Sequence, residues 1–274
     1  MWALLTRAVN DWFRHKSARL GAALAYCSVF SLGPLLLIVT AVAGLFFGAD
    51  AVRSSITSQF RSMLGETGSQ AVEVMLKGAE SATAGGWTAV FGIGLLIVAA
   101  LGVVVQLRDA LNTIFEVKEP DDAGVAWYAK VYGMSLAGIL ALGLLLAVAL
   151  VISAGLAAFS SWFGGSPAES ALLALMNFAV SLAVLTLLFS MLFKWLPDTH
   201  LSWSDVWLGG LVTALLFNIG KSAIGWYIGT QGFESTYGAA ASIVVLLIWV
   251  YYSAQIVLFG AELTQAYAAR RGNG

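Results

Sequence analysis

Apolar and polar positions divide the chain into long apolar runs separated by shorter polar segments. A run of about 20 apolar residues is long enough to cross a bilayer as a helix, because each residue adds about 1.5 Å. The pattern therefore predicts an all-α integral membrane protein with a single membrane domain over residues 1–274. Six transmembrane spans are expected, at residues 20–47, 87–107, 131–159, 172–196, 206–229 and 239–262.

Two stretches outside these spans keep helical periodicity. Residues 1–19 place Trp2 and Val9 among apolar positions opposite a charged face. This pattern predicts either an amphipathic helix in the membrane interface or a plain helical extension packed on the bundle. Residues 48–86 predict two short amphipathic helices joined near residues 65–68, which form a periplasmic cap over the bundle or merely fill space beside it.

The distribution of lysine and arginine predicts the orientation of the chain. An even number of spans places both termini on the same side of the membrane. That side holds ten Lys and Arg residues outside the spans or, for Lys194, at the end of one, whereas the other side holds three, all of them within residues 48–86. Cytoplasmic segments carry an excess of positive residues, so both termini are predicted to be cytoplasmic.

Polar residues of the last span fall on one helical face. Tyr251, Gln255 and Glu262 follow the spacing i, i+4 and i+11. Lipid cannot satisfy such groups, so this face is expected to meet other helices or water. Glu262 lies near the cytoplasmic end, where Arg19 or Arg108 could pair with it. Glu262 is therefore expected either to form a structural salt bridge or to take part in a transport gate.

Lys221 is a cation deep within the fifth span. Such a charge costs about 2.5–3.5 kcal/mol near the middle of a helix, so it needs a partner, water or a route to the surface. Binding of an anionic headgroup is one interpretation, and extension of its long stem to the outer surface is the other. Glu234, in the outer loop before the last span, is the better placed carboxylate partner for Lys221.

The first span carries further candidates. Tyr26 shares a face with Arg19, which is expected to reflect packing or a place along a substrate path. Gly33 and Pro34 fall in mid-span, where proline removes a hydrogen bond and predicts a helix kink.

Composition supports the membrane class and excludes several functions. The chain is 59% hydrophobic and 11% charged, far from the soluble average. Its net charge of −1 gives no basic field for nucleic acid. One cysteine and two histidines form no metal set by spacing, and no catalytic motif is present. We therefore expect no enzyme activity, no metal and no cofactor. Membrane lipids are the expected partners, and glycine pairs spaced as GxxxG permit a homo-oligomer.

Several blocks together resemble the YihY/BrkB family of bacterial inner-membrane proteins. They are LAYCSVFSLGPLLL (24–37), ALNTIFEV (110–117), WLPD (195–198), NIGKSAIGWYI (218–228) and STYGAAASIVVLLIWVYYSAQIVLFGAEL (235–263). The resemblance implies a multi-pass protein of the bacterial inner membrane with a role in the cell envelope. An older family name, after ribonuclease BN, implies tRNA processing, but the chain has no basic patch to bind RNA.

The leading functional hypothesis is transport or flipping of an anionic, lipid-like envelope substrate. Its basis is the polar face of the last span, the deep Lys221, the predicted kink and the outer cap. The alternative is a membrane scaffold for envelope assembly that transports nothing. A transporter should line a hydrated path with Lys221 and Gln255, whereas a scaffold should enclose both in hydrogen-bonded contacts.

Overall fold

The computed structural model describes residues 2–82, 101–117, 133, 167–230 and 241–272, and all of its regular structure there is helical. Its helices are α1 (Trp2–Arg14), α2 (Ser17–Phe47), α3 (Ala49–Ala82), α6 (Pro167–Trp195), α7 (Trp203–Thr230), α9 (Ala241–Arg271) and a helix over residues 101–114. The all-α expectation is thus confirmed for this part of the chain. Most of the predicted second and third spans, and Glu234, lie outside the described residues.

Three of the described helices are long and apolar enough to cross a membrane. The segments are Phe178–Trp195, Trp203–Ile224 and Ala241–Arg271, and they correspond to the predicted fourth, fifth and sixth spans. The last helix continues past the predicted end at residue 262 to Arg271. Residues 263–268 include four buried side chains that pack inside the protein, which explains why the helix does not stop at Glu262. A total of six spans stays a prediction.

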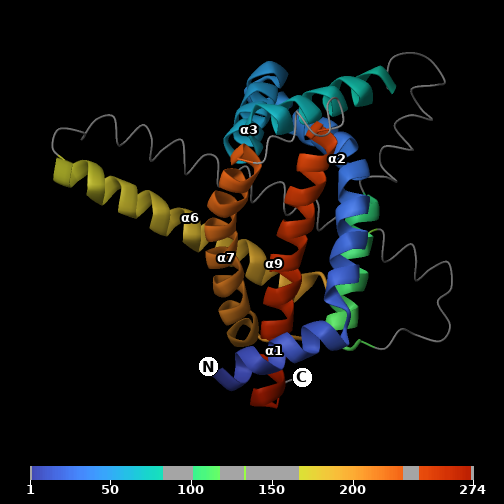
Figure 1. Cartoon of the computed structure of the whole chain (residues 1–274), viewed down its shortest axis with the longest axis vertical. Helices are drawn as coiled ribbons and strands as arrows, with labels where there is room; N and C mark the ends of the chain where they lie inside the picture. The colour runs from blue at the N-terminus through green and yellow to red at the C-terminus, as the bar shows by residue number, and fades with distance from the viewer. Residues whose placement is uncertain (1, 83–100, 118–132, 134–166, 231–240, 273–274) are drawn as a thin grey trace.

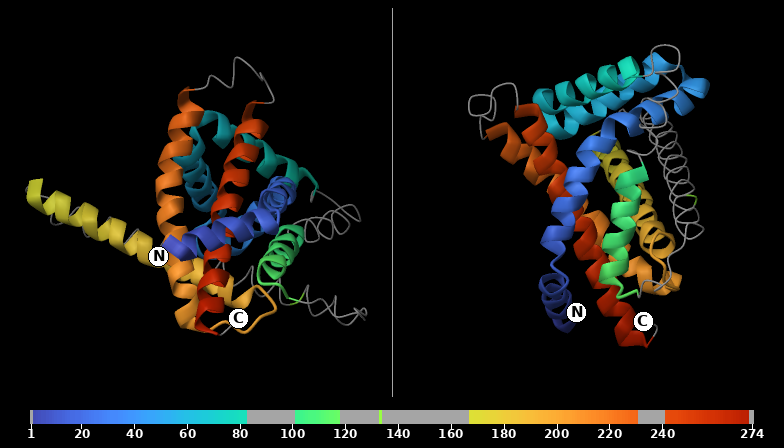
Figure 2. Two further views of the ribbon diagram at one scale, coloured as in Figure 1. Left: turned by 60° about the horizontal axis from the view of Figure 1, so that its bottom comes forward. Right: turned by 90° about the vertical axis from the view of Figure 1, so that its right-hand side faces the viewer.

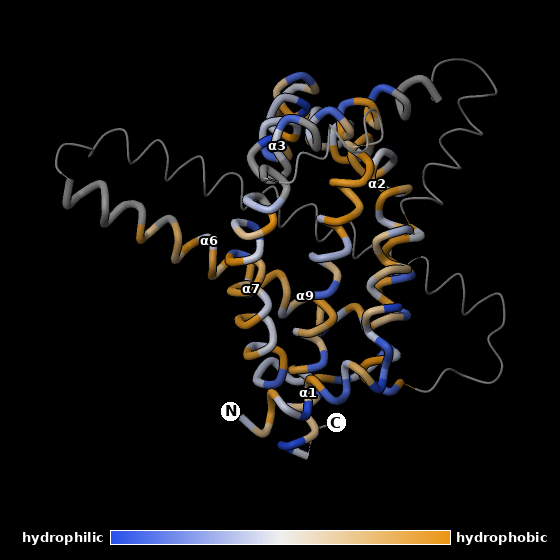
Figure 3. The backbone as a smooth tube through the Cα atoms, in the orientation of Figure 1, coloured by the Kyte–Doolittle hydropathy of each residue, from blue (hydrophilic) through white to orange (hydrophobic). Residues whose placement is uncertain are grey.

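Helices α2, α7 and α9 stand side by side as a bundle (Figure 1), and α9 packs against both of the others. Both chain termini lie at one end of this bundle, here called the terminal end. Helix α3 lies across the opposite end and is more hydrophilic than α2 and α6 (Figure 3). Helix α6 begins away from the bundle, and its later part packs against α7. That this end faces the cytoplasm stays a prediction.

Helices α7 and α9 touch through a reciprocal pair of glycines and threonines. A Cβ added at Gly209 would collide with Thr264, and a Cβ added at Gly260 would collide with Thr213. Each threonine donates its hydroxyl to the glycine carbonyl of its own helix, Thr213 to Gly209 at 2.7 Å and Thr264 to Gly260 at 2.8 Å. Small residues let helix backbones approach closely, so this crossing fixes how the two helices fit together.

Helix α3, here called the cap, is two helical arms that meet at Gly65. This glycine has φ 72° and ψ −170°, a backbone conformation that favours glycine, and it falls within the predicted junction at residues 65–68. The second arm buries Val72 and Leu76 against Leu36 of α2. These contacts attach the cap to the bundle.

Helix α2 is continuous through Gly33 and Pro34, and the bend expected there stays a prediction. Gly33 makes room for the cap, because a Cβ there would lie 3.3 Å from the carbonyl oxygen of Met75. Close approach of two backbones is the second common reason for a glycine in a helix.

Helix α1 lies across the terminal end of the bundle (Figure 2). One side buries Leu4 and Ala8 against Leu263 and Ala266 of α9. The apolar side chains of Trp2, Leu5, Val9 and Phe13 remain exposed. The helix thus combines the two sequence-based interpretations, because it packs on the bundle and also presents an apolar face suited to a membrane interface.

Candidate functional site

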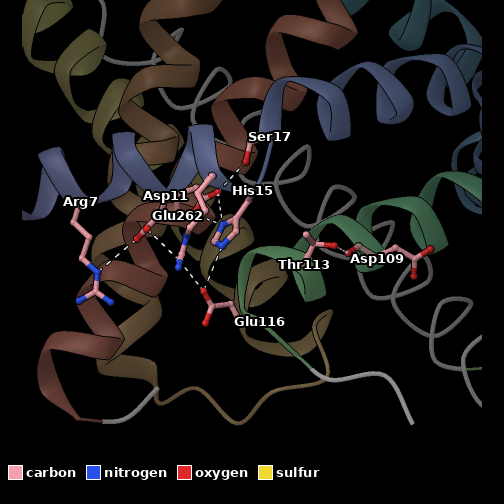
Figure 4. A network of polar contacts seen from close by, with 9 residues as sticks. Arg7, Asp11, His15, Ser17, Asp109, Thr113, Glu116 and Glu262 are labelled. Atoms are coloured by element: carbon pink, nitrogen blue, oxygen red, sulfur yellow. Dashed lines mark hydrogen bonds and ion pairs between the residues drawn. The ribbon is translucent and has the colours of Figure 1, made fainter. Parts of the chain in front are cut away.

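Glu262 is the most completely enclosed charged side chain of α9, with 0% exposure. Its carboxylate accepts a hydrogen bond from the Ser17 hydroxyl at 2.8 Å. The Nδ1 atom of His15 lies 3.0 and 3.1 Å from the two carboxylate oxygens (Figure 4). A buried carboxylate is stable only where such donors replace water. Glu262, His15 and Ser17 are here called the Glu262 cluster.

The junction between α1 and α2 delivers both donors to Glu262. Lys16 separates the two helices and adopts a left-handed conformation, with φ 55° and ψ 41°. Few residues other than glycine occupy this region. The sharp turn places His15 and Ser17, on either side of Lys16, against the same carboxylate of α9.

A second carboxylate approaches the other ring nitrogen of His15. The Nε2 atom of His15 lies 3.4 Å from a carboxylate oxygen of Glu116, just after the helix over residues 101–114. Arg14 donates to that same oxygen at 2.7 Å and also pairs with Asp11 at 3.1 Å. The network joins α1, α2, α9 and the helix over residues 101–114 at the terminal end.

His15 lies between two carboxylates, with Nδ1 toward Glu262 and Nε2 toward Glu116. An imidazole donates from both ring nitrogens only when it is protonated, and a neutral ring donates from one of them. The arrangement ties the turn after α1 to α9 through polar contacts.

The partners of Glu262 differ from those expected. Arg19 is exposed. Arg108, 4% exposed, instead pairs with Asp198 through its Nη2 and through its Nε at 3.0 Å. Asn112 donates to Asp198 at 2.9 Å and accepts its backbone N–H at 2.8 Å. The expectation of an arginine partner for Glu262 was wrong because the turn at Lys16 brings nearer donors.

The other polar residues of α9 do not share one site. Gln255 packs against Gly21, where an added Cβ would collide with its amide. Its Nε2 lies 3.4 Å from the Ala18 carbonyl oxygen, and its Oε1 is buried without a hydrogen-bond partner. Tyr251 is 36% exposed. The shared face predicted for the last span is therefore divided between a closed cluster, a helix contact and the surface.

Lys221 is exposed on α7. It follows Trp203, the first residue of the helix, by 18 positions, which is roughly 27 Å along the axis. The side chains of Ile219 and Trp226, two and five positions away and so on another side of the helix, are also exposed. Lys221 is thus an exposed cation on a helix that also exposes apolar side chains.

Tyr26 is 63% exposed and packs on Phe30, with ring centroids 4.8 Å apart. The structure therefore brings Glu262 into a cluster but does not join it to Lys221, Tyr251 or Tyr26. Sequence reasoning missed His15 and Ser17 as functional candidates. Their position beside the junction of an amphipathic helix and a span was the available signal.

Comparisons with known proteins agree with this architecture. The family model described as "Virulence factor BrkB" matches residues 8–274. A UPF0761 membrane protein of Pseudomonas paraeruginosa is 31% identical over 95% of this chain and 60% of its own length. A UPF0761 membrane protein of Pseudoalteromonas translucida is 30% identical over 88% of this chain and 78% of its own length. No solved structure matches the chain.

The chain spans about 60% of the length of the first curated relatives that it matches. Those relatives are named only as membrane proteins, which agrees with the apolar helices described above. The match to the family model covers nearly the whole chain and confirms the resemblance seen in its sequence blocks. The chain is a membrane protein and belongs to the BrkB family.

Proposed function

We propose that this protein moves an anionic, lipid-like envelope substrate across the bacterial inner membrane. The observation that carries the proposal is the exposure of Lys221 on α7, a helix long and apolar enough to cross a membrane that also exposes the apolar side chains of Ile219 and Trp226. A surface of this kind faces lipid in a membrane-spanning helix. A cation on it needs a counter-charge.

A phosphate headgroup is the counter-charge that a bilayer supplies. A lysine ammonium binds phosphate as a point charge and donates up to three hydrogen bonds. By drawing a headgroup toward the hydrophobic region, Lys221 lowers the barrier to its crossing. With both termini cytoplasmic, as predicted, Lys221 lies in the half of α7 nearer the periplasm.

The Glu262 cluster offers a route by which a proton could drive such transport. His15 and Glu262 hold α1 against α9, so a change of protonation changes that contact. In this proposal, Lys221 attracts the headgroup and the cluster responds to the proton gradient from the cytoplasmic side.

A membrane scaffold that transports nothing is the second candidate. The enclosed hydrogen bonds of Glu262 favour it, because they are what a purely structural contact requires. Under both candidates, we propose that the chain is not an enzyme, binds lipid rather than nucleic acid, and is able to form a homo-oligomer.

Lipid translocation in proteoliposomes separates the two candidates. Fluorescent anionic phospholipid is followed by dithionite quenching, with and without a proton gradient, for the wild type and Lys221→Ala. We expect about a tenfold loss of rate in Lys221→Ala, because one charge-assisted contact is worth about 1.4 kcal/mol or more. Lys221→Arg should retain most of the rate. Arg270→Ala, which removes an exposed cation at the terminal end, is the matched control.

No movement of any lipid by the wild type under either condition would refute transport and favour the scaffold. Equal rates for Lys221→Ala and Arg270→Ala would remove Lys221 from the mechanism. Retention of helical circular dichroism in each variant shows that the comparison concerns folded protein.

A further inference from the structure

A polar hollow of about 540 Å³ lies in the cap. Both arms of α3 contribute to it, the first through residues 50–61 and the second through residues 73–77 (Figure 1). The lining combines charged and hydroxyl side chains with one leucine: Asp50, Arg53, Ser54, Thr57, Ser58, Arg61, Glu73, Leu76 and Lys77. Such a hollow, here called the cap hollow, offers many hydrogen-bonding groups in a small volume.

Apolar contacts between the two arms of α3 hold the walls of the cap hollow in place. Val72 and Leu76 are buried and pack with Ile56 and Phe60 of the first arm. The arms therefore share an apolar seam under the polar hollow. A site on two packed helices is more firmly shaped than one on a loop.

Both signs of charge line the cap hollow. Three of its side chains are cationic and two are carboxylates. Lys77 donates to Glu73 at 2.7 Å, and this hydrogen bond and charge, followed by the two guanidinium groups, lower the pKa of Glu73 below its usual value. Arg61 pairs with Glu66 at 2.9 Å just outside the hollow. The near balance of charge fits a zwitterion better than a polyanion.

Exposed apolar side chains precede the residues of the cap hollow in the chain. Leu45, Phe46 and Phe47 end α2 and are exposed, and α3 begins two residues later, at Ala49. Asp50 and Arg53 of the hollow thus lie within the first two turns after an exposed apolar patch. A polar hollow next to an apolar patch suits an amphiphile, whose head and tail need different surroundings.

We propose that the cap hollow binds the headgroup of a zwitterionic lipid, one that carries both a phosphate and an amine. Arg53 and Lys77 donate to the phosphate oxygens, as cationic side chains do in phosphate sites. Asp50 accepts from the amine, and the acyl chains lie along the apolar end of α2. The site goes beyond the proposed function, because its ligand is a zwitterionic lipid of the surrounding leaflet and not the anionic substrate proposed for transport.

Native mass spectrometry of the full chain in detergent measures binding without any translocation. The probes are dihexanoyl phosphatidylethanolamine, dihexanoyl phosphatidylglycerol, dihexanoylglycerol and free glycerophosphoethanolamine. We expect the first to bind most tightly. Arg53→Gln and Lys77→Gln should each weaken it about tenfold, since each removes a charge-assisted hydrogen bond. Asp50→Asn should reduce the preference over phosphatidylglycerol, and Arg270→Gln, far from the cap, should change nothing.

Equal binding of phosphatidylglycerol and phosphatidylethanolamine would overturn the assignment of an amine site. If free glycerophosphoethanolamine binds as tightly as dihexanoyl phosphatidylethanolamine, the ligand is a soluble phosphate ester and not a lipid. Binding that neither Arg53→Gln nor Lys77→Gln weakens would place the lipid elsewhere. Failure of the wild type to move lipid in proteoliposomes leaves this binding test intact, so loss of the cap site and loss of the proposed function are told apart.

Discussion

Substitution of Gly260 by alanine tests the crossing of α7 and α9. The added methyl would collide with the Thr213 hydroxyl and lie 3.1 Å from the Thr213 Cβ and 3.2 Å from Phe193. Overpacking of this kind costs about 1–3 kcal/mol. Alanine favours a helix over glycine by up to about 1 kcal/mol, which offsets part of this cost. We therefore expect Gly260→Ala to lower the free energy of unfolding by about 1–2 kcal/mol.

The double variant Gly260→Ala/Thr213→Ala should be more stable than the sum of the two single-variant changes in unfolding free energy predicts. Thr213→Ala removes the colliding hydroxyl at the cost of one hydrogen bond, about 1 kcal/mol. The remaining contacts, at 3.1 and 3.2 Å, need shifts of only a few tenths of an ångström. We expect a favourable coupling of about 1 kcal/mol between the two sites.

The reciprocal pair, Gly209 and Thr264, provides the matched control. A Cβ at Gly209 would meet Thr264 and would also lie 2.8 Å from the backbone carbonyl oxygen of Gly260. Thr264→Ala cannot remove that carbonyl, so it should rescue Gly209→Ala far less. Unfolding in mixed micelles of detergent and SDS, followed by circular dichroism, ranks the variants. Equal rescue in both pairs, or wild-type stability of Gly260→Ala, would refute this account of the crossing.

Three further predictions concern other contacts. Glu262→Ala removes the acceptor of His15 and Ser17 and should loosen the junction between α1 and α2. Limited trypsin digestion should then cleave after Lys16 faster than in the wild type or in the control Tyr251→Phe. Unchanged cleavage would contradict this. Arg108→Met removes the guanidinium from Asp198, which keeps its hydrogen bonds with Asn112. The change should lower the free energy of unfolding by about 1.5–3 kcal/mol, measured in mixed micelles; a loss below about 1 kcal/mol would mean that solvent screens the pair. Gly33→Val should push the cap away from α2 and raise hydrogen exchange across α3, and unchanged exchange would show that the cap tolerates the bulk.

Hydrophobic periodicity predicted the helices well where the pattern was long and uniform. The described helices α6, α7 and α9 begin or end within a few residues of the expected spans, because apolar runs and the polar segment around Pro197 mark their limits. The end of α9 was misplaced. Burial against α1 extends that helix beyond its apolar run, and a single-sequence pattern does not contain that tertiary contact.

The candidate site was predicted in part. The depth argument placed Glu262 at the terminal end, where the structure has it, but assigned it an arginine. The choice of partner depends on the left-handed Lys16, a backbone conformation that no sequence pattern marked. The glycines of the α7–α9 crossing were not predicted, since Gly209 and Gly260 pair with threonines and do not follow the GxxxG spacing.

The contact between His15 and Glu262 also sets an order of events during synthesis. Its two residues are 247 positions apart, so the ribosome makes the histidine long before the carboxylate. Until α9 enters the membrane, α1 lacks the helix that buries most of its inner side, and its exposed apolar face is suited to the bilayer surface. Docking of the first helix is therefore a late step in assembly, and it marks the moment at which the last helix has been inserted.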